Sequence, residues 1–311
     1  MIISIFTPHG GCPERCSFCD QKTSGGTPTK PSEIVKVIEE HLSSAQNTQN
    51  IELAFYGGTF TGFTKQRQIQ LLETVKPYLV SNQIQSIRIS TRPDCIEKEW
   101  MYYLFENYKV QTAELGVQSF DPKVLAALGR THSNEDVEKA VLVLKECGLR
   151  VGLHLMIGCP NETEGTDKKN IDYVLKIRPD TIRIHPLLVL KDTHLAQSFK
   201  KKEFEPISLE DAIQRASLLT ECFENNEIRV IRLGLQPQEI LSLSVLAGPY
   251  HPAFGELVRN RIVARAVLEK IKESNVVLNP KEIQSLRSHS QKEFLRLPSQ
   301  IRQSIQSQIV V

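Results

Sequence analysis

Residues 151–156, Val-Gly-Leu-His-Leu-Met, decide the fold class, because a β-strand formed by them has two unlike faces. Successive side chains of a strand point to opposite sides of its sheet. The valine and the two leucines therefore share an apolar face, and the histidine lies on the other. Similar alternation, with polar residues opposite Ile, Leu or Val, recurs in residues 86–92, 114–118 and 181–185. Each strand is thus expected to pack helices on one face and to line a polar interior with the other.

Short β-rich runs alternate with helical patterns along the first 234 residues. We expect strands at 2–7, 51–56, 86–91, 112–118, 150–157, 180–185 and 227–232. We expect helices near 31–44, 65–79, 97–107, 134–147, 164–177 and 208–226. This order indicates parallel pairing with right-handed crossovers. A parallel sheet covered by helices on both sides would be apolar on both faces, so the polar second face predicts an α/β fold, a partial (β/α)6 TIM-like barrel.

The composition excludes several classes of protein. Charged residues are 24% and hydrophobic residues 40% of the 311, which excludes an intrinsically disordered chain. No apolar run approaches the roughly 18 residues of a transmembrane helix, so no membrane partner is expected. Residues 1–6 lack the basic start of a secretion signal and resemble a first strand. Seven cysteines are too few for a disulfide scaffold, and a cytoplasmic protein is expected.

The C-terminal region differs from the rest in charge. We expect a first domain at residues 1–234 and a small, mainly helical appendage at 235–311, with a helix near 254–273 and short helical pieces after it. Ten Lys or Arg and five Asp or Glu give residues 251–311 a charge of +5, so the overall +2 leaves −3 for the first 250 residues. A basic tail indicates a polyanionic partner such as RNA, although a solvated helical surface explains the charge equally well.

Residues 12–19, Cys-Pro-Glu-Arg-Cys-Ser-Phe-Cys, place three thiols in the loop after the first strand. Three soft thiolates at this spacing suit zinc or an iron–sulfur cluster. A structural zinc site needs a fourth ligand, for which His9 is available, so a non-enzymatic zinc or Fe–S binding module stays open as an alternative. On a four-iron cluster, Cys12, Cys16 and Cys19 would leave one iron without a protein ligand, as a catalytic cluster requires. Isolated cysteines at 95, 147, 159 and 222 are expected to be buried apolar residues.

This cysteine segment resembles the signature of the radical S-adenosylmethionine (radical SAM) superfamily, whose fold is a partial (β/α)6 barrel. The resemblance implies that Cys12, Cys16 and Cys19 bind a 4Fe–4S cluster whose open iron chelates S-adenosyl-L-methionine. One electron, delivered by a donor such as a flavodoxin or ferredoxin, then cleaves the cofactor and leaves a 5′-deoxyadenosyl radical. Phe18, the aromatic residue before the last cysteine, is expected to border the adenine.

Other motifs are similar to cofactor-binding segments of this superfamily. Residues 55–59, Phe-Tyr-Gly-Gly-Thr, resemble the loop that binds the methionine amino group. Residues 114–119 and 128–132 resemble the branch containing the oxygen-independent coproporphyrinogen oxidases and the catalytic subunit of Elongator. The resemblance assigns the ribose to Gln118 and the cofactor carboxylate to Arg130, a fork-shaped cation suited to a carboxylate. The cofactor-binding set implied in this way is Gly57, Gly58, Thr59, Ser90, Gln118, Arg130 and His154, with Ser90 standing where both relatives have a ribose-binding glutamate.

The remaining polar residues of the interior are expected to hold the substrate. The predicted set is Arg88, Arg92, Glu114, Arg183 and His185, which would orient a polar, anionic molecule. Tyr56 and Cys159 are the candidate hydrogen donors.

The motifs at residues 58–60 and 91–94 resemble Elongator's subunit, and with the basic tail they favour a nucleoside in tRNA as substrate. A small anionic metabolite or a tetrapyrrole is the alternative, and residues 235–311 are too few for the acetyltransferase domain that Elongator's subunit also carries.

Overall fold

A computed structural model describes residues 1–20, 30–44, 50–236, 239–273 and 282. Its centre is a sheet of seven parallel strands in the order β1-β2-β3-β4-β5-β6-β8. Their bounds are β1 Ile2–Phe6, β2 Glu52–Tyr56, β3 Ser86–Thr91, β4 Val110–Gln118, β5 Arg150–Ile157, β6 Thr181–Pro186 and β8 Arg229–Leu233. Because each strand pairs with the next one of this series, the chain winds in one direction, as in a barrel. The α/β partial barrel predicted from the sequence is confirmed.

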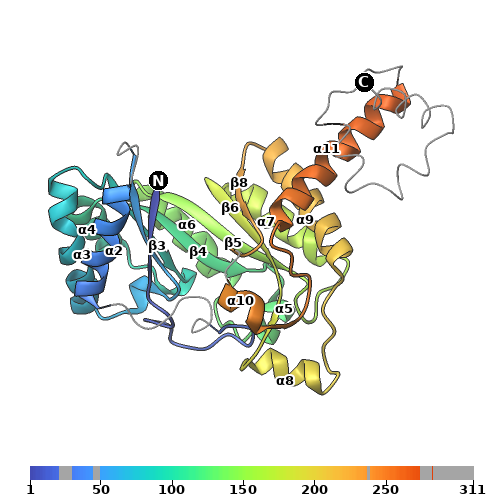
Figure 1. Ribbon diagram of the computed structural model, residues 1–311, viewed down its shortest axis with the longest axis horizontal. Coiled ribbons are helices and arrows are strands. Elements are labelled where there is room, and N and C mark those ends of the chain that lie inside the picture. Colours follow the sequence, from blue (N-terminus) through green and yellow to red (C-terminus); the bar gives the residue numbers. More distant parts are fainter. Residues whose placement is uncertain (21–29, 45–49, 237–238, 274–281, 283–311) are drawn as a thin grey trace.

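Helices cover the outer face of the sheet (Figure 1). Their bounds are α2 Pro31–Ser44, α3 Lys65–Val80, α4 Lys98–Tyr108, α5 Pro122–Ala127, α6 Asn134–Glu146, α7 Thr166–Ile177, α8 His194–Lys200, α9 Leu209–Asn225, α10 Glu239–Ser244 and α11 Phe254–Glu273. All the long helices lie where the sequence predicts them. The short α5, α8 and α10 were missed, together with an antiparallel pair formed by β7 (Val189–Leu190) and β9 (Val245–Ala247). These pieces are too short to show a periodic pattern.

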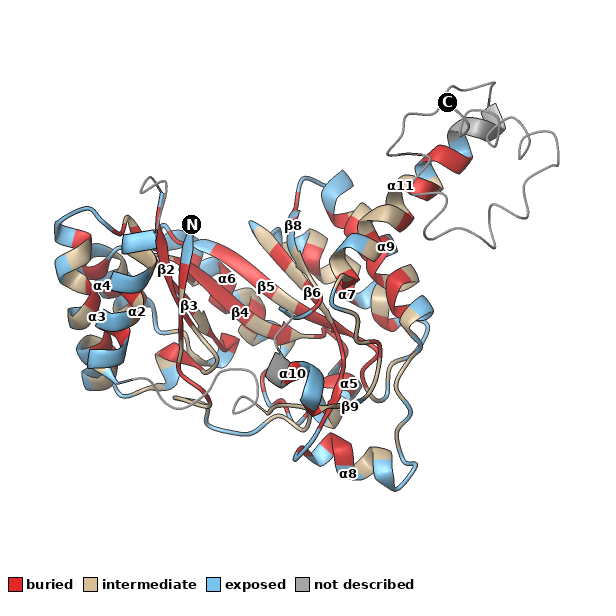
Figure 2. Ribbon diagram, viewed as in Figure 1, coloured by how far each residue is buried: buried red, intermediate tan, exposed pale blue. Residues whose placement is uncertain are grey.

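The two faces of the strands behave as their alternation predicts. Ile89, Leu115 and Leu153 belong to one continuous apolar core between sheet and helices. Burial follows the strands and the inner sides of the helices (Figure 2). His154 and Arg183 lie on the opposite face and line a cavity. The polar face therefore encloses the interior of the half-barrel and is not an exposed sheet surface.

The last described helix, α11, packs along α9, and its arginines make the contact. Arg259 donates to both oxygens of Glu224 at 2.6 and 2.8 Å. Arg261 donates to Glu210 at 2.8 Å, and Arg265 donates to Glu221 at 2.6 Å. The basic segment after residue 250 was expected to offer contacts to a polyanion, but in the structure the charges of these three arginines are paired with carboxylates of α9.

The short helical pieces expected after residue 273 lie outside the described residues. Within the described part of the chain, no helix combines the length and the apolar character needed to cross a lipid bilayer.

Arg265→Glu is expected to destabilise the protein by about 1–2 kcal/mol, because a charge-assisted contact becomes a repulsion of two half-buried carboxylates. Urea unfolding measures the loss, and the swapped pair Arg265→Glu with Glu221→Arg should restore most of it. If Arg265→Glu kept full stability but lost affinity for RNA, Arg265 would be a phosphate contact after all.

Candidate active site

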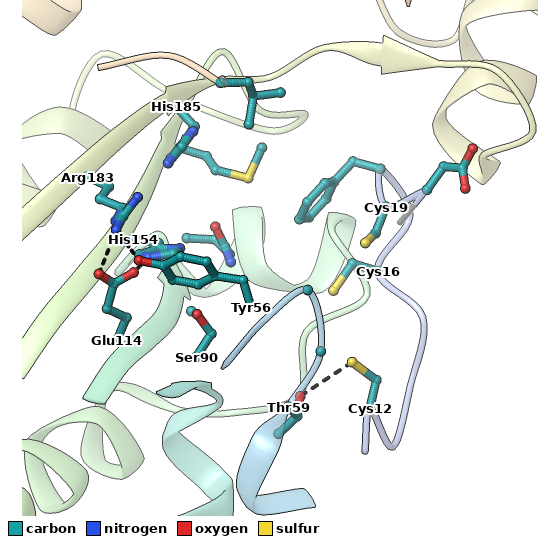
Figure 3. A pocket seen from close by; sticks show the side chains of 18 of the residues that line it. Cys12, Cys16, Cys19, Tyr56, Thr59, Ser90, Glu114, His154, Arg183 and His185 are labelled. Carbon is teal, nitrogen blue, oxygen red and sulfur yellow. Dashed lines mark hydrogen bonds and ion pairs between the residues drawn. The ribbon is translucent and has the colours of Figure 1, made fainter. Parts of the chain in front are cut away.

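A cavity of about 380 Å³ opens at the carboxyl ends of the parallel strands. Figure 3 shows the three cysteines on one side of it and Arg183 and His185 on the other. Its wall includes nearly all residues predicted for the site, namely Cys12, Cys16, Phe18, Cys19, Tyr56, Gly57, Gly58, Thr59, Ser90, Arg92, Glu114, Gln118, Arg130, His154, Arg183 and His185. The structure thus brings together residues that are up to about half the chain apart in sequence.

Backbone hydrogen bonds fix the cysteine loop between two of the short helices. The Ser17 amide donates to Leu128 O at the end of α5 at 3.0 Å, and the Leu195 amide of α8 donates to Ser17 O at 2.8 Å. A turn closed by the Cys19 amide and Cys16 O at 3.1 Å brings the last two cysteines to the same side. The loop is therefore held in place by the barrel and by α8, although α8 itself could not be predicted.

The environment of the thiols suits thiolate ligands. Arg130 Nη1 lies 3.6 Å from the sulfur of Cys16, and the Thr59 hydroxyl lies 3.4 Å from the sulfur of Cys12. A nearby cation and a hydroxyl donor both stabilise a thiolate.

Among the described residues no three His, Cys, Asp or Glu side chains converge as they would around one metal ion. The three thiols nevertheless line one cavity, and three thiolates would suit a four-iron cluster with one open iron. The residues present fit such a cluster.

The Gly-Gly loop after β2 passes directly under the cysteine loop. Gly57 has φ +88°, a conformation that side chains disfavour. A Cβ on Gly58 would lie 2.2 Å from Gly10 O, and the Thr59 amide donates to that same oxygen at 2.8 Å. Glycine at 58 therefore permits a close approach between two segments of this chain.

The end of β4 carries an irregular conformation at the cavity. The register with β5 shifts between Gly116 and Gln118, and Gln118 adopts φ +71°. Such a conformation in a non-glycine residue is strained and is frequently found at functional sites. Arg130 donates to Gly116 O, while its Nε has no hydrogen-bond partner within the described part of the chain. This arrangement leaves a buried guanidinium edge and a glutamine side chain available to a ligand.

Glu114 is the centre of an ion-pair network in the cavity wall. His154 Nε2 lies 2.7 Å from Glu114 Oε2, and Arg183 Nη2 donates to Oε1 at 2.7 Å. Arg88 pairs with the same carboxylate from below. Burial alone would raise the pKa of Glu114, but the hydrogen bond with His154 and the charges of His154, Arg183 and Arg88 hold it well below its usual range. Glu114 is therefore an anion that orders its neighbours.

Tyr56 and His185 border this network. Arg183 Nη2 also donates to the Tyr56 hydroxyl at 2.8 Å. Burial and the charge of Glu114 raise the pKa of Tyr56, so its phenol keeps its proton. Burial and the nearby charges of His154, Arg183 and Arg232 lower the pKa of His185 to about 3, so that ring is neutral at physiological pH. A neutral phenol in the wall is compatible with the hydrogen-donor role predicted for Tyr56.

Two predicted site residues do not reach the cavity. Arg88 lies beneath it, donating to Glu52 at 2.8 Å as well as to Glu114, so it supports the wall instead of meeting a substrate. Cys159 follows Gly158, whose φ of +78° turns the chain away, and it lines a separate pocket. The predictions of a substrate contact at Arg88 and of a hydrogen donor at Cys159 are corrected accordingly.

Arg92 lines the cavity, but its hydrogen bonds go to residues outside the Glu114 network. Its guanidinium donates to both oxygens of Asp94 at 2.8 and 2.6 Å and to the Thr131 hydroxyl at 2.9 Å. It therefore connects the loop after β3 to the segment that carries Arg130, and it takes no part in the Glu114 network. The substrate role predicted for Arg92 has no support in these contacts.

Several residues of the wall were missed by the sequence analysis. Arg232 of β8 lines the cavity, as do apolar side chains at Leu188, Leu190 and Leu241. Strict alternation would have placed Arg232 on the same outward face as Val230. The register between β6 and β8 shifts, with Ile182 opposite Val230 but Arg183 opposite Arg232, and this bulge reverses the face. No local pattern in the sequence signals it.

Comparison with known families decides the class of the site. The profile of the radical SAM superfamily matches residues 6–174, and that of the radical SAM C-terminal domain matches residues 179–264. The chain belongs to the radical SAM superfamily. The predicted enzyme class and the two cofactors of radical SAM proteins, a 4Fe–4S cluster and S-adenosylmethionine, are thereby confirmed at the level of the family.

The more specific likenesses are to longer proteins. The tRNA uridine(34) acetyltransferase of Methanocaldococcus infernus is 28% identical over 300 residues, covering 83% of this chain and 55% of that protein. Protein YhcC of Escherichia coli is 27% identical over 220 residues, covering 66% of this chain and 70% of that protein. This chain spans about half the length of the acetyltransferase that it matches.

Solved radical SAM structures share the fold. Archaeal Elp3 from Methanocaldococcus infernus aligns with a TM-score of 0.69 at 25% identity, covering 85% of this chain and 63% of that chain. Coproporphyrinogen III oxidase from Escherichia coli aligns with a TM-score of 0.53 at 16% identity, covering 72% of this chain and 52% of that chain. The likeness to Elongator's subunit and to the coproporphyrinogen oxidases, expected from the sequence motifs, is confirmed.

Arg130→Ala is expected to weaken binding of S-adenosylmethionine at least tenfold, since it removes the buried guanidinium that the sequence motifs predict to pair with the cofactor carboxylate. Equilibrium dialysis on the anaerobically reconstituted protein measures the affinity, and the iron content shows whether the cluster is intact. Arg178→Ala, which removes an exposed arginine after α7, is the control and should bind normally. Unchanged affinity in Arg130→Ala, with a full cluster, would exclude Arg130 as the carboxylate clamp.

Proposed function

We propose that this protein reductively cleaves S-adenosylmethionine at a 4Fe–4S cluster held by Cys12, Cys16 and Cys19 and uses the product to modify a nucleoside in tRNA. The observation that carries the proposal is the layout of the cavity, with three thiols on one side and the Glu114 network on the other. The likeness to tRNA uridine(34) acetyltransferases along 83% of the chain supports tRNA over other substrates. The reaction would take place in the cytoplasm, with a flavodoxin or ferredoxin as electron donor.

The protein's own part in this reaction is binding, orientation and shielding. When bound, the cluster and S-adenosylmethionine supply the one-electron chemistry. Arg130 and Gln118 would hold the cofactor beside the thiols, and Phe18 would border its adenine. Glu114 orients Arg183 and His154 so that their remaining donors face the cavity. Leu188 and Leu190, buried in the wall, keep water away from the reacting atoms.

Two measurements test this function. The reduced, reconstituted protein should release 5′-deoxyadenosine from S-adenosylmethionine. Nucleosides digested from the tRNA of cells with and without the protein should differ in mass for at least one modified residue. If the protein cleaves the cofactor but the tRNA nucleosides of the two cell types are identical, tRNA is not the substrate. If a protein with a full cluster does not cleave the cofactor, the proposed reaction is wrong.

The first alternative remains an enzyme of the same chemistry acting on a small anionic metabolite. The uncompensated positive charge on the β6–β8 side of the cavity, described below, favours it specifically. Affinity for tRNA that falls steeply with salt distinguishes the two, because each phosphate contact releases counterions.

A further inference from the structure

The last strand of the barrel brings a second arginine to the β6 side of the cavity. Because the β6–β8 register shifts, Arg183 of β6 and Arg232 of β8 are direct neighbours across the sheet. Both side chains line the same cavity. Figure 3 shows Arg183 and His185 on the side of the cavity away from the cysteines. Two guanidinium groups therefore line the part of the cavity where the sequence predicts an anionic substrate without saying which of its groups is bound.

Within the described part of the chain, the positive charges on this side are not fully balanced by carboxylates. Glu114 pairs with Arg183, yet it is already shared with Arg88 and His154. For Arg232 the described residues supply one backbone carbonyl, Gly234 O, at 3.4 Å from Nε, and no carboxylate. Burial, together with the positive charge of Arg183, lowers the pKa of Arg232. Like charges close together in a partly buried wall raise the energy of the empty site, and a bound anion would relieve it.

Unused hydrogen-bond donors and acceptors surround the two arginines. Arg183 Nε and His185 Nδ1 are buried atoms without a hydrogen-bond partner in the described part of the chain. A buried polar atom that stays unpaired costs free energy, so the described residues leave the hydrogen bonding on this side of the cavity incomplete. His185 is neutral at physiological pH, so the ring would offer a hydrogen bond while the arginines supply the charge.

The anion that fits belongs to the substrate and not to the cofactor. Arg130, the residue expected to bind the cofactor carboxylate, contacts the sulfur of Cys16 and lies with the thiols. Arg183 and Arg232 occupy the β6–β8 side. Planar guanidinium groups match the geometry of a phosphate and hold it by two parallel hydrogen bonds. A phosphate is also the anion that every nucleotide of an RNA carries on its ribose.

We propose that Arg183 and Arg232 form a subsite for a phosphate group of the substrate, adjacent to the nucleoside that reacts. This inference rests on the proposed function and specifies which part of the substrate the β6–β8 side recognises. The phosphate can be the phosphodiester of an RNA or the phosphate of a small metabolite, and the experiment separates these two sources. Arg183 is tied to Glu114, so Arg232 is the residue whose replacement removes the subsite alone.

The test compares Arg232→Gln with Arg229→Gln. Arg229 lies on the same strand but is exposed and outside the cavity, so its replacement removes the same charge without touching the subsite. Arg232→Gln is expected to fold with at least the wild-type melting temperature, because it relieves the repulsion with Arg183. The two probes are bulk tRNA, followed by fluorescence anisotropy, and inorganic phosphate, followed by its effect on melting temperature relative to chloride at equal ionic strength.

We expect Arg232→Gln to bind tRNA at least tenfold more weakly than wild type, with a salt slope reduced by about one unit. It should also lose the increase in melting temperature that phosphate produces in the wild type. Arg229→Gln should behave as wild type in both assays. Affinity for S-adenosylmethionine should be unchanged in both variants, and its loss in Arg232→Gln would assign Arg232 to the cofactor and overturn the proposal.

The remaining outcomes separate the subsite from the proposed function. If phosphate stabilises the wild type through Arg232 but tRNA does not bind, or binds equally to Arg232→Gln, the subsite stands and serves a phosphorylated metabolite, so tRNA is withdrawn. If tRNA binds and neither probe distinguishes Arg232→Gln from wild type, the subsite is wrong while the tRNA function survives. If neither probe affects the wild type, both are wrong.

Discussion

Replacing Cys12, Cys16 or Cys19 with Ala is expected to abolish the iron–sulfur cluster and, with it, all cleavage of S-adenosylmethionine. The three thiols line one cavity and come from a single short loop, so the loss of any one leaves two ligands for a cluster that needs three. Iron and sulfide analysis after anaerobic reconstitution measures the cluster, and release of 5′-deoxyadenosine measures the reaction. We expect four irons per wild-type protein and no cluster in any of the three variants.

Cys95→Ala and Cys222→Ala are the matched controls. Neither residue lines the cavity, and burial raises the pKa of both thiols, to about 11 for Cys95, so neither is disposed to bind a metal as thiolate. Both variants should keep the cluster. Stoichiometric zinc in the native protein, or a complete cluster in a Cys16→Ala protein, would contradict the assignment.

Glu114→Ala is expected to destabilise the protein by about 3–5 kcal/mol, because it leaves Arg88, Arg183 and His154 without the anion that they share in a buried site. Urea unfolding measures the effect. Glu146→Ala removes an exposed carboxylate that pairs with Lys98 at 2.7 Å, and it should cost less than about 1 kcal/mol. If the two variants lost the same free energy of unfolding, the Glu114 network would contribute no more to stability than a surface ion pair does.

The same carboxylate makes stability depend on pH. The folded protein holds the pKa of Glu114 well below its ordinary value, so the unfolded chain takes up a proton at a higher pH than the folded protein does. The contribution of Glu114 is therefore complete above the ordinary glutamate pKa of about 4.3 and is lost as the pH falls below it. The Glu114→Ala protein should therefore lose less stability than the wild type when the pH falls below that value, because it lacks this carboxylate.

The architecture and one side of the site could be predicted because they depend on local patterns. Alternating side chains in residues 86–92, 114–118 and 181–185 assigned each strand an apolar and a polar face, and the core confirms the apolar one. Three cysteines within residues 12–19 needed no tertiary information to indicate a metal centre. The strands of the sheet run parallel, so polar residues near their carboxyl ends had to meet in one cavity.

Tertiary structure decided which polar residues are available to a ligand. Arg88 faces inward, as predicted, but Glu52 and Glu114 neutralise it below the cavity. Arg265 belongs to a basic segment, yet Glu221 on α9 pairs with it. In both cases the partner lies far away in sequence. The free energy of a charged side chain depends on the charge that packing places beside it.

Tertiary structure also reversed the direction of one side chain, that of Arg232, and it placed Cys159 outside the cavity. Cys159 follows a left-handed glycine that ends β5, so it leaves the cavity. Arg232 follows a register shift against β6, so it enters the cavity. Alternation holds only while the pairing register is unbroken, because one extra residue moves every later side chain to the opposite face. The residues themselves reveal the period of a strand, but only its pairing with the neighbouring strand shows where that period breaks.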